Sequence, residues 1–293
     1  MASLREVKNR ISSVEGTRKI TSAMRMVASA KLARVEEKIE NMLPYQQKLD
    51  EIVGKLLSSM ESIKSPFIVE REPKRIALIA VSSNTTLCGA YNANVFRETT
   101  KQIKKLSHLG EDSLFIYPIG NQIHRSLKKA GYNLMGSYTE LADNPTYSES
   151  YALAEELMDD FKKGKIDKVM IVYHHFRSIA AQELRVEQFL PFDLSAYKAE
   201  KEDKQGLSST IEYLIEPNQE ELIEELLPKV ISQKLFTTLV DTNAAEHGAR
   251  SMAMQLATDN ADDMVEDLTK LYNKSRQQAV TNELLDIIGG SMR

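Results

Sequence analysis

The stretch LREVKNRISSV, from Leu4 to Val14, decides the fold of this chain. Its apolar residues Leu4, Val7, Ile11 and Val14 are separated by steps of three, four and three. This spacing places them along one face of an α-helix, as a helix that packs against a partner requires. The N-terminus is therefore predicted to be one half of a helix pair.

The same pattern continues well beyond this stretch. Val35, Ile39 and Met42 repeat the spacing, and the helix is predicted to run to about Ile63. A helix of about 60 residues is roughly 90 Å long at about 1.5 Å per residue. Pro44 lies inside it, and because proline removes one backbone hydrogen bond we expect a kink or a short break there.

The C-terminus shows the same periodicity, from Lys229 to Ile288. Apolar or small residues step by four, three and four at Met264, Leu268, Leu271 and Ser275. We expect these four residues to form the seam of the second helix. Two such helices from opposite ends of the chain are predicted to pair as a long antiparallel coiled coil.

The middle of the chain has a different period. Short apolar runs typical of buried strands alternate with amphipathic helical segments, which predicts an α/β layer with a mostly parallel sheet. The expected strands are residues 75–81, 113–119, 169–173 and 183–190, with a further edge strand at 132–140 and a short strand at 212–215. The expected helices are residues 92–109, 121–130, 148–163 and 220–227, and Pro228 is expected to begin the long C-terminal helix.

Composition excludes several classes of protein. The chain has 293 residues, a net charge of −4 and one cysteine, Cys88, so it cannot form an intramolecular disulfide and fits a reducing compartment. No apolar run is long enough to span a membrane, and the start has no signal-peptide core. The sequence predicts a soluble protein, with peripheral attachment through partners left open.

Charge is distributed unevenly over the predicted helices. Basic residues dominate the N-terminal segment, at Arg5, Lys8, Arg10, Arg18, Lys19, Arg25, Lys31 and Arg34. Acidic residues cluster on the last helix, at Asp259, Asp262, Asp263, Glu266 and Asp267. Three interpretations stay open: solvated helix faces, a basic stripe that meets acidic loops of a surrounding partner, or a nucleic-acid surface, which the lack of interleaved aromatic residues disfavours.

Motifs for catalysis are missing. The sequence has neither a G-x-x-x-x-G-K-[ST] nor a G-x-G-x-x-G motif, and no metal-ligand spacing accompanies His174-His175. Cys88 has no histidine at a spacing that suggests a base. The absence of these motifs favours a mechanical or scaffolding role, with no metal and no cofactor.

Three runs of sequence together resemble the γ subunit of F-type ATP synthase. They are ISSVEGTRKITSAMRMVASAK at Ile11–Lys31, VSSNTTLCGAYN at Val81–Asn92, and ATDN at Ala257–Asn260 followed by YNKSRQ at Tyr272–Gln277 and TNEL at Thr281–Leu284. They occur in the family's order and span the chain. In the middle run most family members carry Asp-Arg-Gly before Leu-Cys-Gly, whereas this chain has Asn84-Thr85-Thr86.

The resemblance implies a fold and a function. The fold is an antiparallel coiled coil of the terminal helices, residues 1–64 and 218–293, with a Rossmann-like α/β domain at residues 65–217. The function is that of the central stalk or rotor of the F1Fo ATP synthase, which transmits rotation of the membrane c-ring to the catalytic α3β3 hexamer. The chain is then a non-catalytic subunit that binds the α, β and ε subunits and the c-ring, and no nucleic acid. It is then peripheral to a bacterial plasma membrane, on the cytoplasmic side, and associates with it only through the Fo sector.

The resemblance also implies contact residues. Those expected to meet the β subunits are Arg276, Gln277, Thr281, Glu283, Met24, Arg25, Arg250 and Lys19. Tyr213 and Glu216 are expected to face the c-ring or the ε subunit. Two rival hypotheses remain: a free-standing nucleotide-binding α/β protein with helical arms, and a coiled-coil adaptor on nucleic acid.

Overall fold

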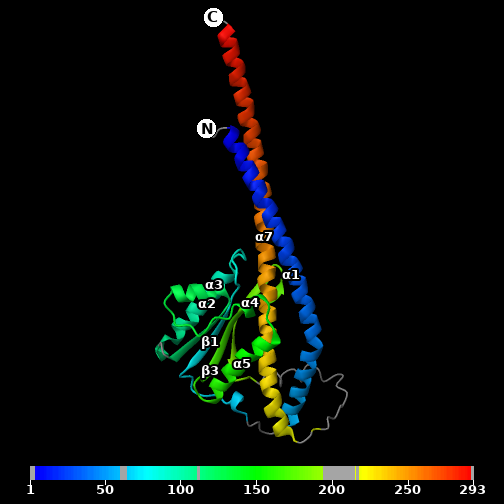
Figure 1. The fold of residues 1–293 in the computed structure, drawn as a ribbon, viewed down its shortest axis with the longest axis vertical. Coiled ribbons are helices and arrows are strands. Elements are labelled where there is room, and N and C mark those ends of the chain that lie inside the picture. The colour runs from blue at the N-terminus through cyan, green and yellow to red at the C-terminus, as the bar shows by residue number, and fades with distance from the viewer. Residues whose placement is uncertain (1–3, 60–64, 111–112, 194–214, 216–217, 292–293) are drawn as a thin grey trace. The chain divides into compact units, whose positions relative to one another are not determined.

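A computed structural model describes residues 4–59, 65–110, 113–193, 215 and 218–291 of the chain. Its Cα positions group into two compact units (Figure 1). One unit comprises Met1–Ala30 with Arg250–Arg293, and the other comprises Lys31–Ala249. We call them the paired-helix unit and the α/β unit.

Helices at both ends enclose a run of alternating strands and shorter helices. The elements are α1 (Leu4–Ser59), η1 (Pro66–Ile68), β1 (Ile76–Val81), α2 (Tyr91–Leu106), η2 (Ser107–Leu109), β2 (Leu114–Ile119), α3 (Asn121–Lys129), α4 (Glu140–Asp143), α5 (Tyr147–Lys162), β3 (Lys168–Ser178), β4 (Ala181–Leu190) and α7 (Gln219–Ser291). This order confirms the predicted α/β fold with a long helix at each end.

The α/β unit is built on a four-stranded sheet in the order β2-β1-β3-β4. β1 pairs in parallel with β2 and with β3, while β4 runs antiparallel to β3. The sheet is thus mostly parallel, as predicted. Strands joined in parallel need a crossover, and α2 and α5 supply it.

Alternate residues of β1 enter two different cores, because successive side chains of a strand point to opposite faces. Ala77, Ile79 and Val81 face a large core, while Leu78 and Ala80 face a smaller one. The smaller core is closed by α2 and α3. The larger core is closed by α5, by the second half of α1 with Leu49, Val53 and Leu56, and by the first half of α7 with Ile231, Leu235 and Leu239.

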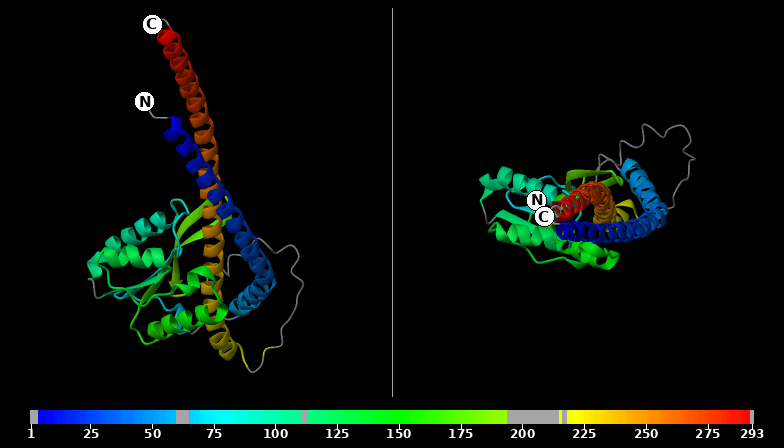
Figure 2. Two further views of the ribbon diagram at one scale, coloured as in Figure 1. Left: turned by 45° about the horizontal axis from the view of Figure 1, so that its top comes forward. Right: turned by 90° about the horizontal axis from the view of Figure 1, so that it is seen from above.

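The paired-helix unit consists of the first part of α1 and the last part of α7, which lie side by side in Figures 1 and 2. Three cross-helix hydrogen bonds of 2.8–2.9 Å and a fourth, from Arg25 to Gln255, join the two. The chain directions are opposite, which confirms the antiparallel pairing expected from the sequence.

Several local predictions were wrong. Of the kink or break expected at Pro44, the break is absent, because α1 continues through this residue. α7 begins at Gln219 and not at Pro228, through which it continues. Residues 132–140 form no strand; only isolated bridges at Leu134 and Tyr138 touch β2. The predicted strand at 212–215 falls almost wholly outside the described residues. Packing of both long helices into the larger core outweighs the cost of the prolines.

Candidate functional site: the paired ends of the terminal helices

The seam of α1 follows a strict seven-residue repeat. From Leu4 to Ala28 the positions at steps of three and four are all buried or half-buried. They are Leu4, Val7, Ile11, Val14, Arg18, Thr21, Arg25 and Ala28. The predicted face at Leu4–Val14 is therefore confirmed, and the repeat admits two arginines and a threonine further along.

The seam of α7 follows the same repeat. Its buried or half-buried positions are Ser251, Met254, Thr258, Ala261, Val265, Leu268, Tyr272, Ser275 and Ala279. The prediction was right for Leu268 and Ser275 but wrong for Met264 and Leu271, which are 54% and 45% exposed. Val265 and Tyr272, one residue further on in each case, take their places, so the prediction had the order of the three- and four-residue steps reversed.

Polar bonds across the seam fix its register. Thr21 and Thr258 share a 2.8 Å hydroxyl–hydroxyl hydrogen bond, and Ser29 and Ser251 share one of 2.9 Å. The two residue numbers of a pair add to 279 or 280, as expected for antiparallel helices in one constant register. The same register places Leu4, the first described residue, opposite Arg276.

The remaining cross-helix contacts involve charge. Arg18 donates to the Asp262 carboxylate at 2.8 Å, and this hydrogen bond raises the pKa of Arg18. Arg25 donates to the side-chain oxygen of Gln255. Part of the basic stripe of α1 thus meets the acidic cluster of α7 within the chain itself. Both Arg18 and Asp262 remain substantially exposed, so the pair also faces solvent.

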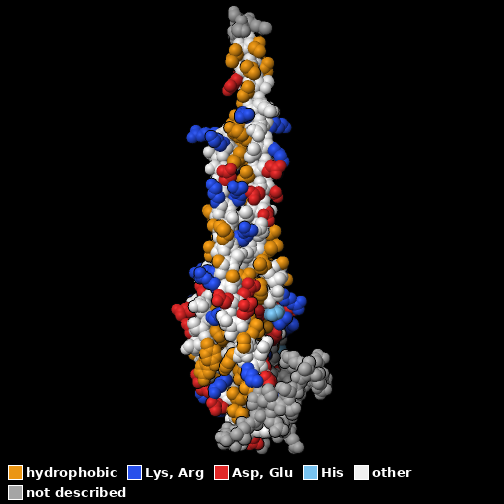
Figure 3. Space-filling view, turned by 90° about the vertical axis from the view of Figure 1, so that its right-hand side faces the viewer, with side chains coloured by type: hydrophobic (Ala, Val, Ile, Leu, Met, Phe, Trp, Pro, Cys, Tyr) orange, Lys and Arg blue, Asp and Glu red, His pale blue; other side chains and the backbone are white. Residues whose placement is uncertain are grey.

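The end of α7 beyond Arg276 has no described α1 residue opposite it. Its large apolar side chains are exposed: Val280 49%, Leu284 54%, Leu285 61%, Ile287 67% and Ile288 53%. Figure 3 shows hydrophobic side chains gathered toward this end, with few charged ones among them. Exposed apolar surface of this kind marks an interaction site.

Further exposed apolar residues lie on the outside of the pair. They are Ile20, Met26 and Val27 on α1 and Met252, Leu256, Met264 and Leu271 on α7. Our reading of the sequence missed this outer surface. Extending the seven-residue repeat from Val14 would have found it, because these residues fall off the repeat and so cannot belong to the seam.

The predicted contact residues fall into two groups. Arg276, Gln277, Thr281 and Glu283 are exposed, and so is Lys19. The Thr281 hydroxyl donates to the Gln277 carbonyl oxygen at 2.9 Å. In contrast, Met24 and Arg25 are half-buried, and Arg250 is 9% exposed. Tyr213 and Glu216 lie outside the described residues.

Groups suited to catalysis do not converge among the described residues. No three His, Cys, Asp or Glu side chains in that part of the chain could share a metal ion. Cys88 is buried, and burial lowers the pKa of His174 to about 4, so that it is neutral at pH 7. In the loop after β1, Asn84 accepts from the Asn121 backbone amide at 2.9 Å and donates to the Thr139 carbonyl at 2.7 Å. Asn84 therefore connects this loop to the start of α3 and to Thr139 before α4, which is a structural role.

Comparison with known proteins identifies the family. Residues 3–292 match the ATP synthase family. A protein of Bacteroides fragilis called ATP synthase gamma chain is 53% identical over 292 residues, covering 100% of both chains. The chain belongs to the ATP synthase gamma chain family. A gamma chain of Bacteroides thetaiotaomicron is 51% identical, and one of Legionella pneumophila is 35% identical over 99% of both chains.

Solved structures share the fold of this chain. A chain of the Euglena gracilis mitochondrial ATP synthase, described with OSCP, F1 and c-ring, superposes with a TM-score of 0.64 at 18% identity, covering 99% of this chain and 93% of that one. A chain of the Tetrahymena thermophila central stalk and c-ring gives a TM-score of 0.56 at 20% identity, covering 81% and 99%. Among the described residues no helix has both the length and the apolar character to cross a membrane.

Proposed function

We propose that this chain is the rotating shaft of a bacterial ATP synthase. Its paired terminal helices turn inside the ring of α and β subunits, and its α/β unit contacts the ε subunit and the membrane c-ring. Rotation of the membrane c-ring turns this shaft, and the shaft then drives the β subunits through their conformational states. The chain itself does no chemistry; ATP is made by the hexamer.

The observation that carries this proposal is the end of α7 after Arg276. A helix that must turn inside a sleeve needs a surface without fixed, directional bonds. Leu284, Leu285, Ile287 and Ile288 provide such a surface, because dispersion and apolar burial are non-directional. A helix end that stayed in water in the assembled complex would not be expected to carry four large apolar side chains within residues 284–288.

Polar residues next to this end are suited to brief contacts. We propose that Arg276, Gln277, Thr281 and Glu283 meet the β subunits as the shaft turns, since all four are exposed. Lys19 and Met24 lie on α1, farther from the C-terminal end of α7, and are secondary candidates for contact with the β subunits. Arg25 and Arg250 act mainly within the chain, because Arg25 is bonded to Gln255 and Arg250 is largely buried. Exposed ion pairs contribute only about 0–1 kcal/mol, which suits contacts that must break at every step.

The location follows from the same proposal. The similar gamma chains of Bacteroides fragilis and Bacteroides thetaiotaomicron come from bacteria. We therefore place the chain on the cytoplasmic side of a bacterial plasma membrane, held there by the membrane sector of the complex. Tyr213 and Glu216 remain our candidates for the contact with that sector.

Co-expression with the α and β subunits of the same bacterium tests the proposal. We expect the chain to co-purify with three copies of each and the complex to hydrolyse ATP. Truncation after Gln277, which removes residues 278–293, should keep the paired helices and hence assembly, but reduce the ATPase rate. Substitution of the exposed Lys129, on α3 of the α/β unit, by Ala is the control and should leave the rate unchanged.

Two outcomes would overturn the proposal. One is failure of the full-length chain to co-purify with α and β. The other is micromolar binding of ATP or a dinucleotide to the isolated chain in calorimetry, which would favour the free-standing nucleotide-binding alternative.

A further inference from the structure

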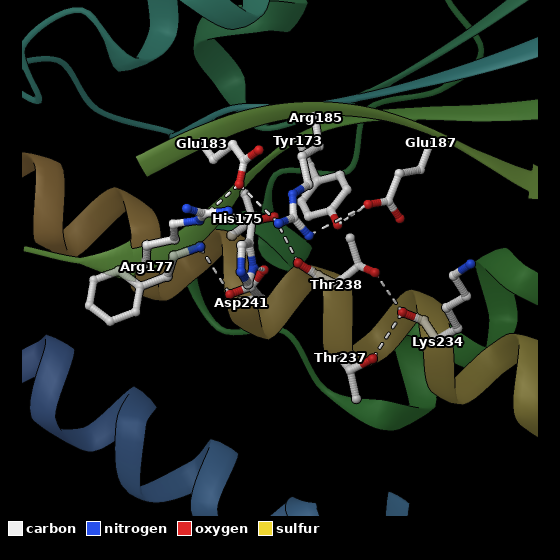
Figure 4. A network of polar contacts seen from close by, with 12 residues as sticks. Tyr173, His175, Arg177, Glu183, Arg185, Glu187, Lys234, Thr237, Thr238 and Asp241 are labelled. Atoms are coloured by element: carbon white, nitrogen blue, oxygen red, sulfur yellow. Dashed lines mark hydrogen bonds and ion pairs between the residues drawn. The ribbon is translucent and has the colours of Figure 1, made fainter. Parts of the chain in front are cut away.

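Three consecutive residues of α7 bond to three different elements of the α/β unit. The first is Asp241, which faces β3 (Figure 4). One carboxylate oxygen lies 2.7 Å from Nδ1 of His175, and the other accepts from the backbone amide of Phe176 at 3.1 Å. Both oxygens of this carboxylate are therefore fixed to the same strand.

The next two residues point to other elements. The backbone carbonyl of Thr242 accepts a 3.1 Å hydrogen bond from the hydroxyl of Tyr91, the first residue of α2. The side-chain amide of Asn243 donates to the carbonyls of Ala142 at 2.8 Å and Asp143 at 3.3 Å, at the end of α4. Thr242 and Asn243 are 2% and 5% exposed, so these bonds are sheltered from water.

Helix geometry gives this triplet a mechanical meaning. Successive residues of an α-helix are turned by about 100°, since 3.6 residues make one turn. The side chains of Asp241 and Asn243 therefore leave the helix about 200° apart, on nearly opposite sides, while Tyr91 bonds to the backbone carbonyl of Thr242, which runs roughly along the helix axis. Directed bonds on nearly opposite sides of the helix both resist its rotation about its own axis.

On either side of this triplet, α7 contacts the rest of the α/β unit by apolar packing. Before the triplet, Ile231, Leu235 and Leu239 pack into the larger core. After it, Gly248 lies so close to Phe176 that an added Cβ would be 2.9 Å from the ring. Apolar packing holds the helix against the sheet, but it is non-directional. Hydrogen bonds depend steeply on angle, so the triplet adds a directional resistance to twisting.

We propose that Asp241, Thr242 and Asn243 form a torsional anchor, through which torque passes between the α/β unit and α7. The inference rests on the proposed function as a rotating shaft. The three residues are positioning residues: they touch no other subunit, and they keep α7 from turning within its own α/β unit under load.

Single-molecule tracking of the assembled complex tests the anchor. The hexamer is fixed to a surface, and a bead is attached to the α/β unit through Lys101→Cys on α2, where the lysine side chain is 59% exposed. Without ATP, the angular fluctuation of the bead reports the stiffness of the path from bead to hexamer. With Asp241→Ala and Asn243→Ala combined, the variance should rise at least about twofold, because directed bonds to two of the three elements are lost.

A second bead position separates the anchor from general loosening. Tyr45, on α1, is 59% exposed, and a bead on Tyr45→Cys is joined to the hexamer without passing through the triplet. We expect its fluctuation to be unchanged in the same double variant. Thr237→Ala is the matched control on α7, because the Thr237 hydroxyl donates to the Lys234 carbonyl of its own helix. If the double variant fails to assemble, Tyr91→Phe removes the hydroxyl that donates to the Thr242 carbonyl and should give a smaller broadening.

The outcomes are distinct. Broadening at the α2 bead alone supports the anchor. Equal fluctuation in wild type and variant at the α2 bead overturns it, and so does equal broadening at both beads. If the wild-type bead does not rotate when ATP is supplied, the proposed function fails instead.

Discussion

The α/β unit and the paired-helix unit use the same residue types in opposite ways. Leu157 of α5 is fully buried in the larger core, whereas Leu284 of α7 is 54% exposed. The α/β unit therefore gains stability from its leucines, and the end of α7 does not. Apolar residues that add nothing to folding must be explained by another role, which we assign to contact with a surrounding partner.

The largest expected effect comes from making the same substitution in both regions. Leu157→Ala should lower the free energy of unfolding by about 2–5 kcal/mol, because it opens a cavity in a packed core. Leu284→Ala should change it by less than about 0.5 kcal/mol. Urea unfolding of the isolated chain measures both. A similar loss in the two variants would mean that α7 buries its end within the chain.

The same substitution, glycine to alanine, should also have opposite effects on stability in the two units. Gly120 follows β2 with φ of +98°, and an added Cβ would lie 2.2 Å from the carbonyl oxygen of Ser82. Gly120→Ala should therefore destabilise the chain by at least about 2 kcal/mol. Gly16 of α1 has open space around it, so Gly16→Ala should stabilise the helix by about 0.5–1 kcal/mol. Thermal unfolding of the two variants should shift in opposite directions; two shifts of equal sign would contradict the contrast.

Acid should weaken the α/β unit through His174. Its ring stacks on Tyr91 at 4.3 Å, and burial lowers its pKa to about 4 from an ordinary value of 6.5. A depressed folded pKa means that the contribution to stability is present above pH 6.5 and is lost as the pH falls toward 4. Between pH 7 and pH 5 this loss is about 2 kcal/mol. His174→Phe keeps a stacked ring and should flatten the pH dependence of the urea midpoint; an unchanged slope would exclude His174 as its source.

The smallest expected effect lies in the paired-helix unit. Arg18→Ala removes an ion pair with Asp262 in which both partners are solvent-exposed. Screening by water and salt leaves such a pair with little effect on stability. The melting temperature should shift by less than in either glycine variant, and less again at high salt. A salt-independent loss comparable to that of Leu157→Ala would mean that the pair is sheltered.

Sequence periodicity predicted the architecture well and the seam only in part. The steps from Leu4 to Val14 were sufficient for α1, and the apolar runs predicted all four strands of the sheet. The seam of α7 was misassigned at Met264 and Leu271, because the steps of three and four were taken in the reverse order; Val265 and Tyr272, one residue further on, are the seam positions. Which residue faces the partner helix depends on the register, and that is set by bonds such as Thr21–Thr258 between residues 237 positions apart.

The anchor on α7 could not be predicted from sequence for a related reason. Asp241, Thr242 and Asn243 are ordinary polar residues in a helix, and nothing in their spacing indicates a partner. Their bonds go to residues about 65 to 150 positions away, which only the fold of the sheet brings near. In contrast, the exposed contact residues Arg276 and Gln277 came from a family motif, and the structure shows only that they are accessible.

The central claim is that this chain rotates as a shaft within the hexamer. The most direct test is to fix the α3β3 hexamer to a surface, attach a bead through Lys101→Cys on the α/β unit, and add ATP. The account predicts continuous rotation in one direction at a rate that follows ATP hydrolysis. A bead that stays still while the same complex hydrolyses ATP would contradict it.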